Sequence, residues 1–325
     1  EKEYEVEAIL DERVKEALEK EYLVKWTGYS QPTWEPREFL EDTIALDRWE
    51  NRVAAYAAGS RLDTTSPDLT YTWKQAMSTS EAAEFIKAAD KEYNSLINND
   101  TWDIVEHPPN RRVVGSKWVF RKVMFPDGTL KKFKARAVCQ GFTQRAGIDF
   151  QDTYAPTLPM PVLRLLLAYS VRYALDIHSM DAVTAFLNSP IDKEIYVEQF
   201  EGYEDAQHPR TRWVLWLKKG LYGLKQSPLL WYNTLRAALE NLGYTTAPNC
   251  PCVFYKYACG GRPTSPTPTT LVLLMVFVDD ILICTKAPDQ MERTKSELRS
   301  KFTFTDQGRV NNHLGLQYYY EPSVE

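Results

Sequence analysis

Two adjacent carboxylates stand between two short apolar runs. Asp279 and Asp280 follow the run Leu-Val-Leu-Leu-Met-Val-Phe-Val and precede Ile-Leu-Ile-Cys, so that residues 271–284 form one segment. Apolar runs of this length, rich in Val, Ile and Leu, predict buried strands, and the segment predicts a β-hairpin whose tight turn presents both aspartates. Carboxylates in such surroundings need a partner, commonly a divalent cation. The pair is also compatible with a polar turn on a surface hairpin.

A third carboxylate would supply the set that metal-assisted phosphoryl transfer needs. The segment 177–181, Ile-His-Ser-Met-Asp, predicts a strand that ends at Asp181 and turns into a short helix. Taken alone, Asp181 is an ordinary acid at the end of a strand. With Asp279 and Asp280 it completes a trio that could hold two metal ions, one lowering the pKa of an attacking hydroxyl and the other stabilising a leaving pyrophosphate.

A strongly basic segment accompanies these acids. Residues 111–145 hold ten Lys and Arg residues against one acid, Asp127, although the whole chain has a net charge of -5. Between 117 and 136 cations alternate with aromatic and aliphatic residues around a Pro-Asp-Gly turn, which predicts a β-hairpin with its cations on one face. That face could bind phosphates or could simply be solvated. We favour polyanion binding because the local charge is opposite to that of the chain.

The first fifty residues predict a small domain of their own. Alternating patterns at 4–11 and 21–26, and a short run at 33–36 stopped by proline, predict three strands, and residues 43–53 suit a closing helix. The motifs Tyr-Leu-Val-Lys-Trp-Thr-Gly-Tyr at 22–29 and Thr-Trp-Glu-Pro at 33–36 stand in the order found in chromodomains. This segment therefore resembles the chromodomain family.

The chromodomain resemblance implies a three-stranded antiparallel sheet with a C-terminal helix. It also implies a methyl-lysine cage formed by Tyr4, Trp26 and Tyr29, against which a histone tail lies as an added strand. Charge supports a basic partner, because residues 1–50 hold seven Lys and Arg against fifteen Asp and Glu. The aromatic residues could instead form the core of the sheet, which is the interpretation we prefer for Trp34.

From about Trp73 onward the chain resembles the reverse transcriptases of copia-type retrotransposons. The motifs that carry this resemblance stand in family order: Asn-Asp-Thr-Trp (99–102), Lys-Trp-Val-Phe (117–120), Lys-Ala-Arg (134–136), Gln-Gly-Phe (140–142), Asp-Ala-Val-Thr-Ala-Phe-Leu-Asn (181–188), Leu-Tyr-Gly-Leu-Lys-Gln-Ser-Pro (221–228) and Phe-Val-Asp-Asp (277–280). We therefore expect an α+β chain with a chromodomain at 1–53, a linker at 54–72 and a fingers–palm reverse-transcriptase fold at 73–325.

The reverse-transcriptase resemblance also implies the site. Three carboxylates of the palm would be catalytic and bind Mg²⁺ or Mn²⁺: Asp181, Asp279 and Asp280. Six residues would line the nucleotide and template pocket: Phe186, Gln226, Ser227, Lys122, Lys134 and Arg136. Phe186 would be the aromatic gate that excludes a ribose 2′-hydroxyl, a role compatible with a core position in the following helix. The three basic residues would neutralise phosphates.

Two functions remain as hypotheses. The first is an RNA-directed DNA polymerase that uses dNTPs on an RNA or DNA primer-template and is tethered to a histone-binding chromodomain. The second is a chromatin-binding protein that carries an inactive reverse-transcriptase remnant. Five cysteines, an odd number, favour reduced thiols and an intracellular location, nuclear rather than cytoplasmic given the chromodomain, and no membrane partner is expected. Because 45 of the 325 residues follow Asp280, we expect an incomplete thumb and no RNase H domain.

Overall fold

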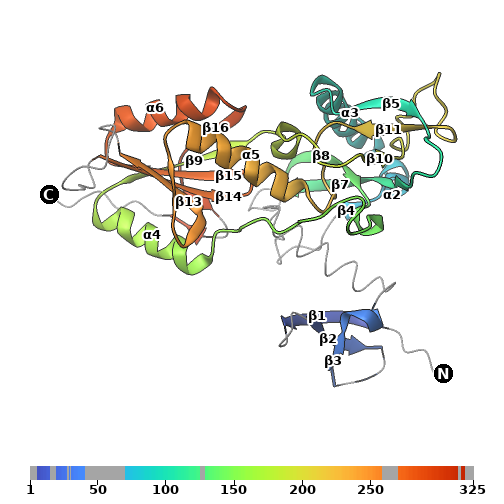
Figure 1. The fold of residues 1–325 in the computed structure, drawn as a ribbon, viewed down its shortest axis with the longest axis horizontal. Helices are drawn as coiled ribbons and strands as arrows, with labels where there is room; N and C mark the ends of the chain where they lie inside the picture. Colours follow the sequence, from blue (N-terminus) through green and yellow to red (C-terminus); the bar gives the residue numbers. More distant parts are fainter. Residues whose placement is uncertain are drawn as a thin grey trace. The chain divides into compact units, whose positions relative to one another are not determined.

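The chain forms two compact units, Glu1–Arg61 and Leu62–Glu325. The structure is a computed structural model that describes residues 6–14, 20–27, 29, 31–40, 70–124, 129–257, 270–313 and 316–318. Figure 1 shows mixed helices and sheets, as the α+β prediction requires. No helix among the described residues is long and apolar enough to cross a membrane.

The first unit is a small antiparallel sheet with strand order β1-β2-β3. Its elements are β1 (Val6–Val14), β2 (Lys20–Trp26), β3 (Thr33–Pro36) and a 3-10 helix, η1 (Arg37–Leu40). Ile9, Tyr22, Val24 and Leu40 are buried together, because alternation along a strand sends every second side chain to the same face. All three expected strands are present. The closing helix expected at 43–53 lies outside the described residues.

The second unit begins with a three-stranded sheet of order β4-β7-β8, here called the hairpin sheet. Its strands are β4 (Thr70–Tyr71), β7 (Ser116–Met124) and β8 (Leu130–Cys139). Two helices precede the hairpin, α2 (Trp73–Met77) and α3 (Ala82–Asn98). The linker was expected to reach residue 72, but β4 pairs with β7 and Thr72 caps α2, so these residues belong to the second unit.

A second small sheet, of order β5-β11-β10-β6, adjoins the hairpin sheet through a shared core. Its strands are β5 (Trp102–Glu106), β6 (Val113–Val114), β10 (Tyr196–Val197) and β11 (Trp213–Leu217). Aromatic rings fill the space between α3 and the two sheets; for example, the Trp118 ring lies 5.5 Å from that of Phe200 and the Phe85 ring 5.4 Å from that of Phe120. The hairpin is therefore anchored at its base by apolar burial.

The remaining strands form an antiparallel sheet of order β12-β13-β14-β15-β9-β16, here called the large sheet. Its strands are β9 (Asp176–Ala182), β12 (Thr245–Ala247), β13 (Cys250–Tyr257), β14 (Leu271–Phe277), β15 (Asp280–Thr285) and β16 (Phe304–Arg309). A further pair, β17 (Asn312–His313) and β18 (Leu316–Gln317), follows it. The apolar runs that predicted buried strands are buried at both faces.

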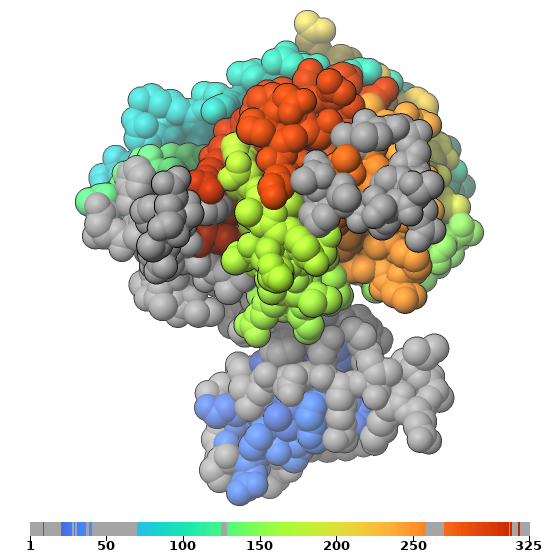
Figure 2. Space-filling model, turned by 90° about the vertical axis from the view of Figure 1, so that its left-hand side faces the viewer, coloured from blue at the N-terminus to red at the C-terminus, as the bar shows by residue number. Residues whose placement is uncertain are grey.

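Helices cover both faces of the large sheet (Figure 1). They are α4 (Met160–Arg172), α5 (Ser227–Asn241) and α6 (Pro288–Arg299). Leu163 of α4 packs against Leu273 and Met275, whereas Met291 and Leu298 of α6 are buried on the side of β15. Figure 2 shows α4 at the surface. Its Leu165 and Val171 are 67% and 77% exposed, because one side of a helix that covers a sheet faces outward.

Candidate active site

The hairpin of β14 and β15 ends in a strained turn that carries one of the predicted catalytic acids. Val278 has φ of 55°, a left-handed conformation that β-branched residues rarely adopt. The Trp231 indole Nε1 on α5 donates a hydrogen bond of 2.7 Å to the Val278 carbonyl. Asp279 follows in the turn. Strain of this kind persists only where the surroundings impose the conformation, and it is commonly found at functional sites.

Strand pairing brings the third predicted acid to the same place. Asp280 is the first residue of β15, not part of the turn, and it lies opposite Asp181 of β9 in the antiparallel register. The backbone N–H of Ala182 donates a hydrogen bond of 2.7 Å to the Asp279 carbonyl. Asp181, which stands about 100 residues before the other two acids in the sequence, therefore lies with them at one end of the large sheet.

The electrostatics of these acids favour a cationic partner. Burial, and then the nearby Asp181 carboxylate, raise the pKa of Asp279 to about 6. Burial also raises the pKa of Asp181, although Lys134 opposes the shift. Within the described ranges, Asp279 Oδ1 is a buried oxygen without a hydrogen-bond partner. Among the described residues, no group of three or more His, Cys, Asp or Glu side chains has the arrangement of a metal site. The buried, unpartnered oxygen beside a second carboxylate nevertheless suits a divalent cation.

The hairpin sheet turns a cationic face toward these acids. Lys132, Lys134 and Arg136 alternate along β8 and therefore point to one face, which Arg121 of β7 shares because it pairs directly with Lys134. Lys134 is an exposed residue, yet desolvation of its ammonium group, and then Arg136 and Lys132, lower its pKa to about 8. Asp279 opposes that shift, so the cations and the carboxylates interact across the two sheets.

Lys122 does not join this face, contrary to our expectation. It pairs opposite Phe133, in phase with the buried Trp118 and Phe120, and so lies on the other side of the hairpin. There it forms an ion pair with Glu81 and lies 5.8 Å from the centre of the Phe133 ring. The physical reason is the period of two of a β-strand, which places adjacent cations on opposite faces.

Two residues that sequence reasoning missed lie among these charges. The guanidinium of Arg136 lies over the Tyr222 ring, 5.0 Å from its centre, and the rings of Tyr222 and Phe186 meet edge to face at 4.8 Å. Glu92 of α3 accepts a hydrogen bond from the Ala137 backbone, and burial raises its pKa against the opposing charge of Arg136. Tyr222 stands in the quoted Leu-Tyr-Gly-Leu-Lys-Gln-Ser-Pro motif, so the motif was a signal for it. For Glu92 the sequence held no such signal.

The other predicted pocket residues are buried in the protein. Phe186 is 3% exposed. Gln226 receives a hydrogen bond from Gln144 Nε2 (3.1 Å) and donates to the Asp149 carbonyl (2.9 Å). Ser227 Oγ bonds the N–H and the C=O of Leu221, at 3.0 and 2.8 Å. Gln226 and Ser227 therefore fix the loop before α5 from within, and their polar atoms are occupied by protein groups.

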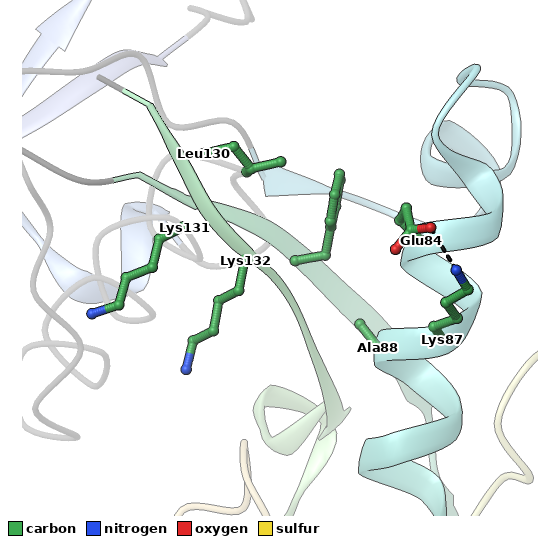
Figure 3. A pocket seen from close by; sticks show the side chains of 7 residues that line it. Glu84, Lys87, Ala88, Leu130, Lys131 and Lys132 are labelled. Carbon is green, nitrogen blue, oxygen red and sulfur yellow. Dashed lines mark hydrogen bonds and ion pairs between the residues drawn. The ribbon is translucent and has the colours of Figure 1, made fainter. Parts of the chain in front are cut away.

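A separate shallow cavity of about 370 Å³ lies between α3 and β8 (Figure 3). Its lining residues are Glu84, Lys87, Ala88, Leu130, Lys131, Lys132 and Phe133. Glu84 and Lys87 pair with each other at 2.7 Å, and the side chains of Lys131 and Lys132 extend away from the helix. The cavity contains none of the three predicted catalytic acids.

The predicted methyl-lysine cage is described in part. Trp26 ends β2, and its indole Nε1 donates a hydrogen bond of 2.8 Å to Thr33 Oγ1, which in turn donates to Glu35 at 2.6 Å. Tyr29 is 55% exposed, and its N–H bonds the Trp26 carbonyl at 3.1 Å. Tyr4 lies outside the described residues. Two of the three aromatic residues are thus joined by one turn.

Comparisons with known proteins agree with both resemblances. Residues 99–323 match the family model described as reverse transcriptase (RNA-dependent DNA polymerase), and residues 4–52 match the chromo (chromatin organisation modifier) domain. A retrovirus-related Pol polyprotein from transposon TNT 1-94 of Nicotiana tabacum is 33% identical over 244 residues, which is 75% of this chain and 18% of that protein. The Pol polyprotein from transposon RE1 of Arabidopsis thaliana is 33% identical over 231 residues, 71% of this chain and 15% of that protein.

The chain thus spans less than a fifth of the length of these two relatives. Among solved structures, a foamy viral protease-reverse transcriptase in complex with double-stranded DNA aligns with a TM-score of 0.32 and 14% identity, covering 66% of this chain and 28% of that chain.

Proposed function

Since the chain belongs to the reverse transcriptase (RNA-dependent DNA polymerase) family and carries a chromodomain, we propose that its second unit extends a primer with deoxynucleotides on an RNA template. The observation that carries this proposal is the meeting of two opposite charge clusters. The buried Asp279 Oδ1 and the buried Arg136 Nε both have no hydrogen-bond partner among the described residues. A metal-bound triphosphate offers a cation to the first and an anion to the second.

Asp181 and Asp279, with Asp280 beside them in the register, are the residues that would hold Mg²⁺ or Mn²⁺. When bound, the metal would supply charge stabilisation for the attacking 3′-hydroxyl and the leaving pyrophosphate. The raised pKa of Asp279 fits this role, because a nearby cation favours the ionised carboxylate and so restores the form that binds. Lys134 and Arg136, which lie on the hairpin sheet, would bind the phosphates of the nucleotide.

Phe186 would limit the sugar that the pocket accepts. It follows the left-handed Thr184 (φ 50°) by two residues and is packed against Tyr222. A ring held so firmly cannot move aside for an added 2′-hydroxyl, so it would discriminate against ribonucleotides by steric exclusion. Gln226 and Ser227 would contribute indirectly, by fixing the loop that carries Tyr222.

A primer-extension assay tests the proposal. Wild-type protein, Asp279→Asn and the control Asp289→Asn would be given poly(rA)/oligo(dT), dTTP and Mg²⁺. Asp289 is an exposed acid in the first turn of α6 and serves as a matched removal of one charge. We expect incorporation by the wild type and the control and a loss of at least about 100-fold in Asp279→Asn. Equal incorporation by both variants would contradict the proposal.

The chromodomain supports a second activity, the binding of a histone tail. Tyr29 is exposed beside Trp26, and the first fifty residues are strongly acidic, which suits a basic peptide carrying methyl-lysine. A histone partner would place the protein in the nucleus. Titration with a methylated and an unmethylated lysine peptide tests this proposal. The wild type should bind the methylated peptide more tightly, and Trp26→Ala should lose this preference. Binding here together with absent incorporation would favour a chromatin-binding protein with an inactive polymerase.

A further inference from the structure

Arg136 is held against an aromatic ring at the centre of the candidate active site. Its guanidinium lies over the ring of Tyr222, 5.0 Å from the ring centre, and its Nε has no hydrogen-bond partner among the described residues. A ring beneath the plane of a guanidinium attracts the cation and leaves the in-plane N–H groups for an anion. Tyr222 thus restricts the orientation of a cation without occupying its donors.

Tyr222 is itself fixed to the strand that carries Arg136. The Cys139 N–H at the end of β8 donates a hydrogen bond of 2.7 Å to the Tyr222 carbonyl. Gly223 has φ of +89°, and a Cβ there would lie 2.0 Å from the Cys139 carbonyl oxygen. A Cβ on Gly141 would lie 2.0 Å from the Gly223 carbonyl oxygen. Two backbone segments therefore cross so closely that only glycine fits, and the crossing sets the ring position relative to β8.

Tyr222 also touches the other parts of the site. Its ring meets that of Phe186 at 4.8 Å, edge to face. Burial raises the pKa of its hydroxyl to about 12, with Arg136 opposing the shift and Asp279 adding to it. The hydroxyl therefore stays protonated at neutral pH, and the ring remains an uncharged surface between the cation and the carboxylates.

We propose that Tyr222 is a positioning residue whose ring orients the Arg136 guanidinium for the triphosphate of the incoming nucleotide. This inference rests on the proposed polymerase function. It concerns the ring and not the hydroxyl, because the contact with Arg136 is made by the aromatic face. Tyr222→Phe should therefore preserve the function and Tyr222→Leu should lose it. A side chain that merely fills space would tolerate both substitutions to a similar extent.

The experiment measures the KM for dTTP and the kcat of primer extension in both variants. We expect Tyr222→Phe to stay within about twofold of the wild type and Tyr222→Leu to raise the KM by about fivefold with little change in kcat. Tyr173→Leu is the matched control, since Tyr173 also lies beside an arginine, Arg172, at 5.8 Å, but at the end of α4. It should leave the KM unchanged.

A double-mutant cycle tests whether Tyr222 acts through Arg136. On an Arg136→Lys background, Tyr222→Leu should add less than about twofold to the KM, because the oriented guanidinium is already gone. An undiminished fivefold effect on that background, or a loss confined to kcat, would overturn the inference.

Binding of inorganic tripolyphosphate, followed by calorimetry without primer or metal, separates this inference from the polymerase proposal. Weakening by Tyr222→Leu but not by Tyr222→Phe would support the inference even if no variant incorporated dTTP. Equal affinity of all the proteins would refute it even if the wild type were an active polymerase.

Discussion

The carboxylate that we expect to be essential for catalysis should destabilise the free protein. In Asp279 the pKa is raised from 3.8 to about 6, so the folded state holds a proton more tightly than the unfolded state does. The contribution of this carboxyl to the free energy of unfolding is then fully present below pH 3.8 and is lost as the pH rises through 6. A shift of about two pKa units at 1.36 kcal/mol per unit corresponds to about 3 kcal/mol above pH 7. This value is an upper bound, because the carboxylate is only partly buried.

Asp279→Asn removes the titrating group and should recover that free energy. Without divalent metal, we expect the variant to exceed the wild type in the free energy of unfolding by up to about 3 kcal/mol at pH 8 and by about 1 kcal/mol at pH 4.5. Urea unfolding with a chelator present measures the difference at each pH. Asp289→Asn, an exposed acid, is the control for the loss of a charge. A gain that is independent of pH, or a variant less stable than the wild type at pH 8, would refute the reasoning.

Two further predictions concern packing. Gly223→Ala and Gly243→Ala both place a side chain at a positive φ, but only the alanine at 223 would meet a backbone atom, at 2.0 Å. We expect urea unfolding to show that the free energy of unfolding falls by about 3 kcal/mol in Gly223→Ala and by about 1 kcal/mol in Gly243→Ala. An equal decrease in the two variants would contradict the steric argument. Asp306 forms an ion pair of 3.0 Å with the buried Lys295, so Asp306→Asn should lower the free energy of unfolding by about 2 kcal/mol. Adding Lys295→Met should restore most of it, and no recovery would argue against the buried charge as the cause.

The sequence predicted the strands of the active-site hairpin better than it predicted what surrounds them. Apolar runs identified β14 and β15, but the pairing of Asp280 with Asp181 depends on which strands become neighbours. Strand order is a non-local property, so the residues alone offered this trio only as a chemical possibility, which the family resemblance then supported. The same limit explains why Glu92 was missed, since its surroundings come from β8, more than 40 residues away.

Other differences were present in the sequence pattern. The segment Lys-Trp-Val-Phe-Arg-Lys places Lys122 in phase with Trp118 and Phe120, so strict alternation already assigns it to the buried side of the hairpin. Helix α3 begins at Ala82, with Glu81 at its N-cap position, because the residues before it form a turn after α2. The apolar residues of α4 are covered on one side only, because a single sheet face contacts one side of a helix.

The glycine crossing fixes the hairpin sheet at one point, close to Arg136. Arg136 lies three residues from Cys139 at that crossing, and Leu130 lies nine residues away, which at 3.3 Å per residue is about 10 Å and about 30 Å. A difference of about 10° in the direction of β8 at the crossing would displace Leu130 by about 5 Å and Arg136 by less than about 2 Å. The position of Arg136 therefore depends much less on the direction of β8 than the position of the outer end of the hairpin does.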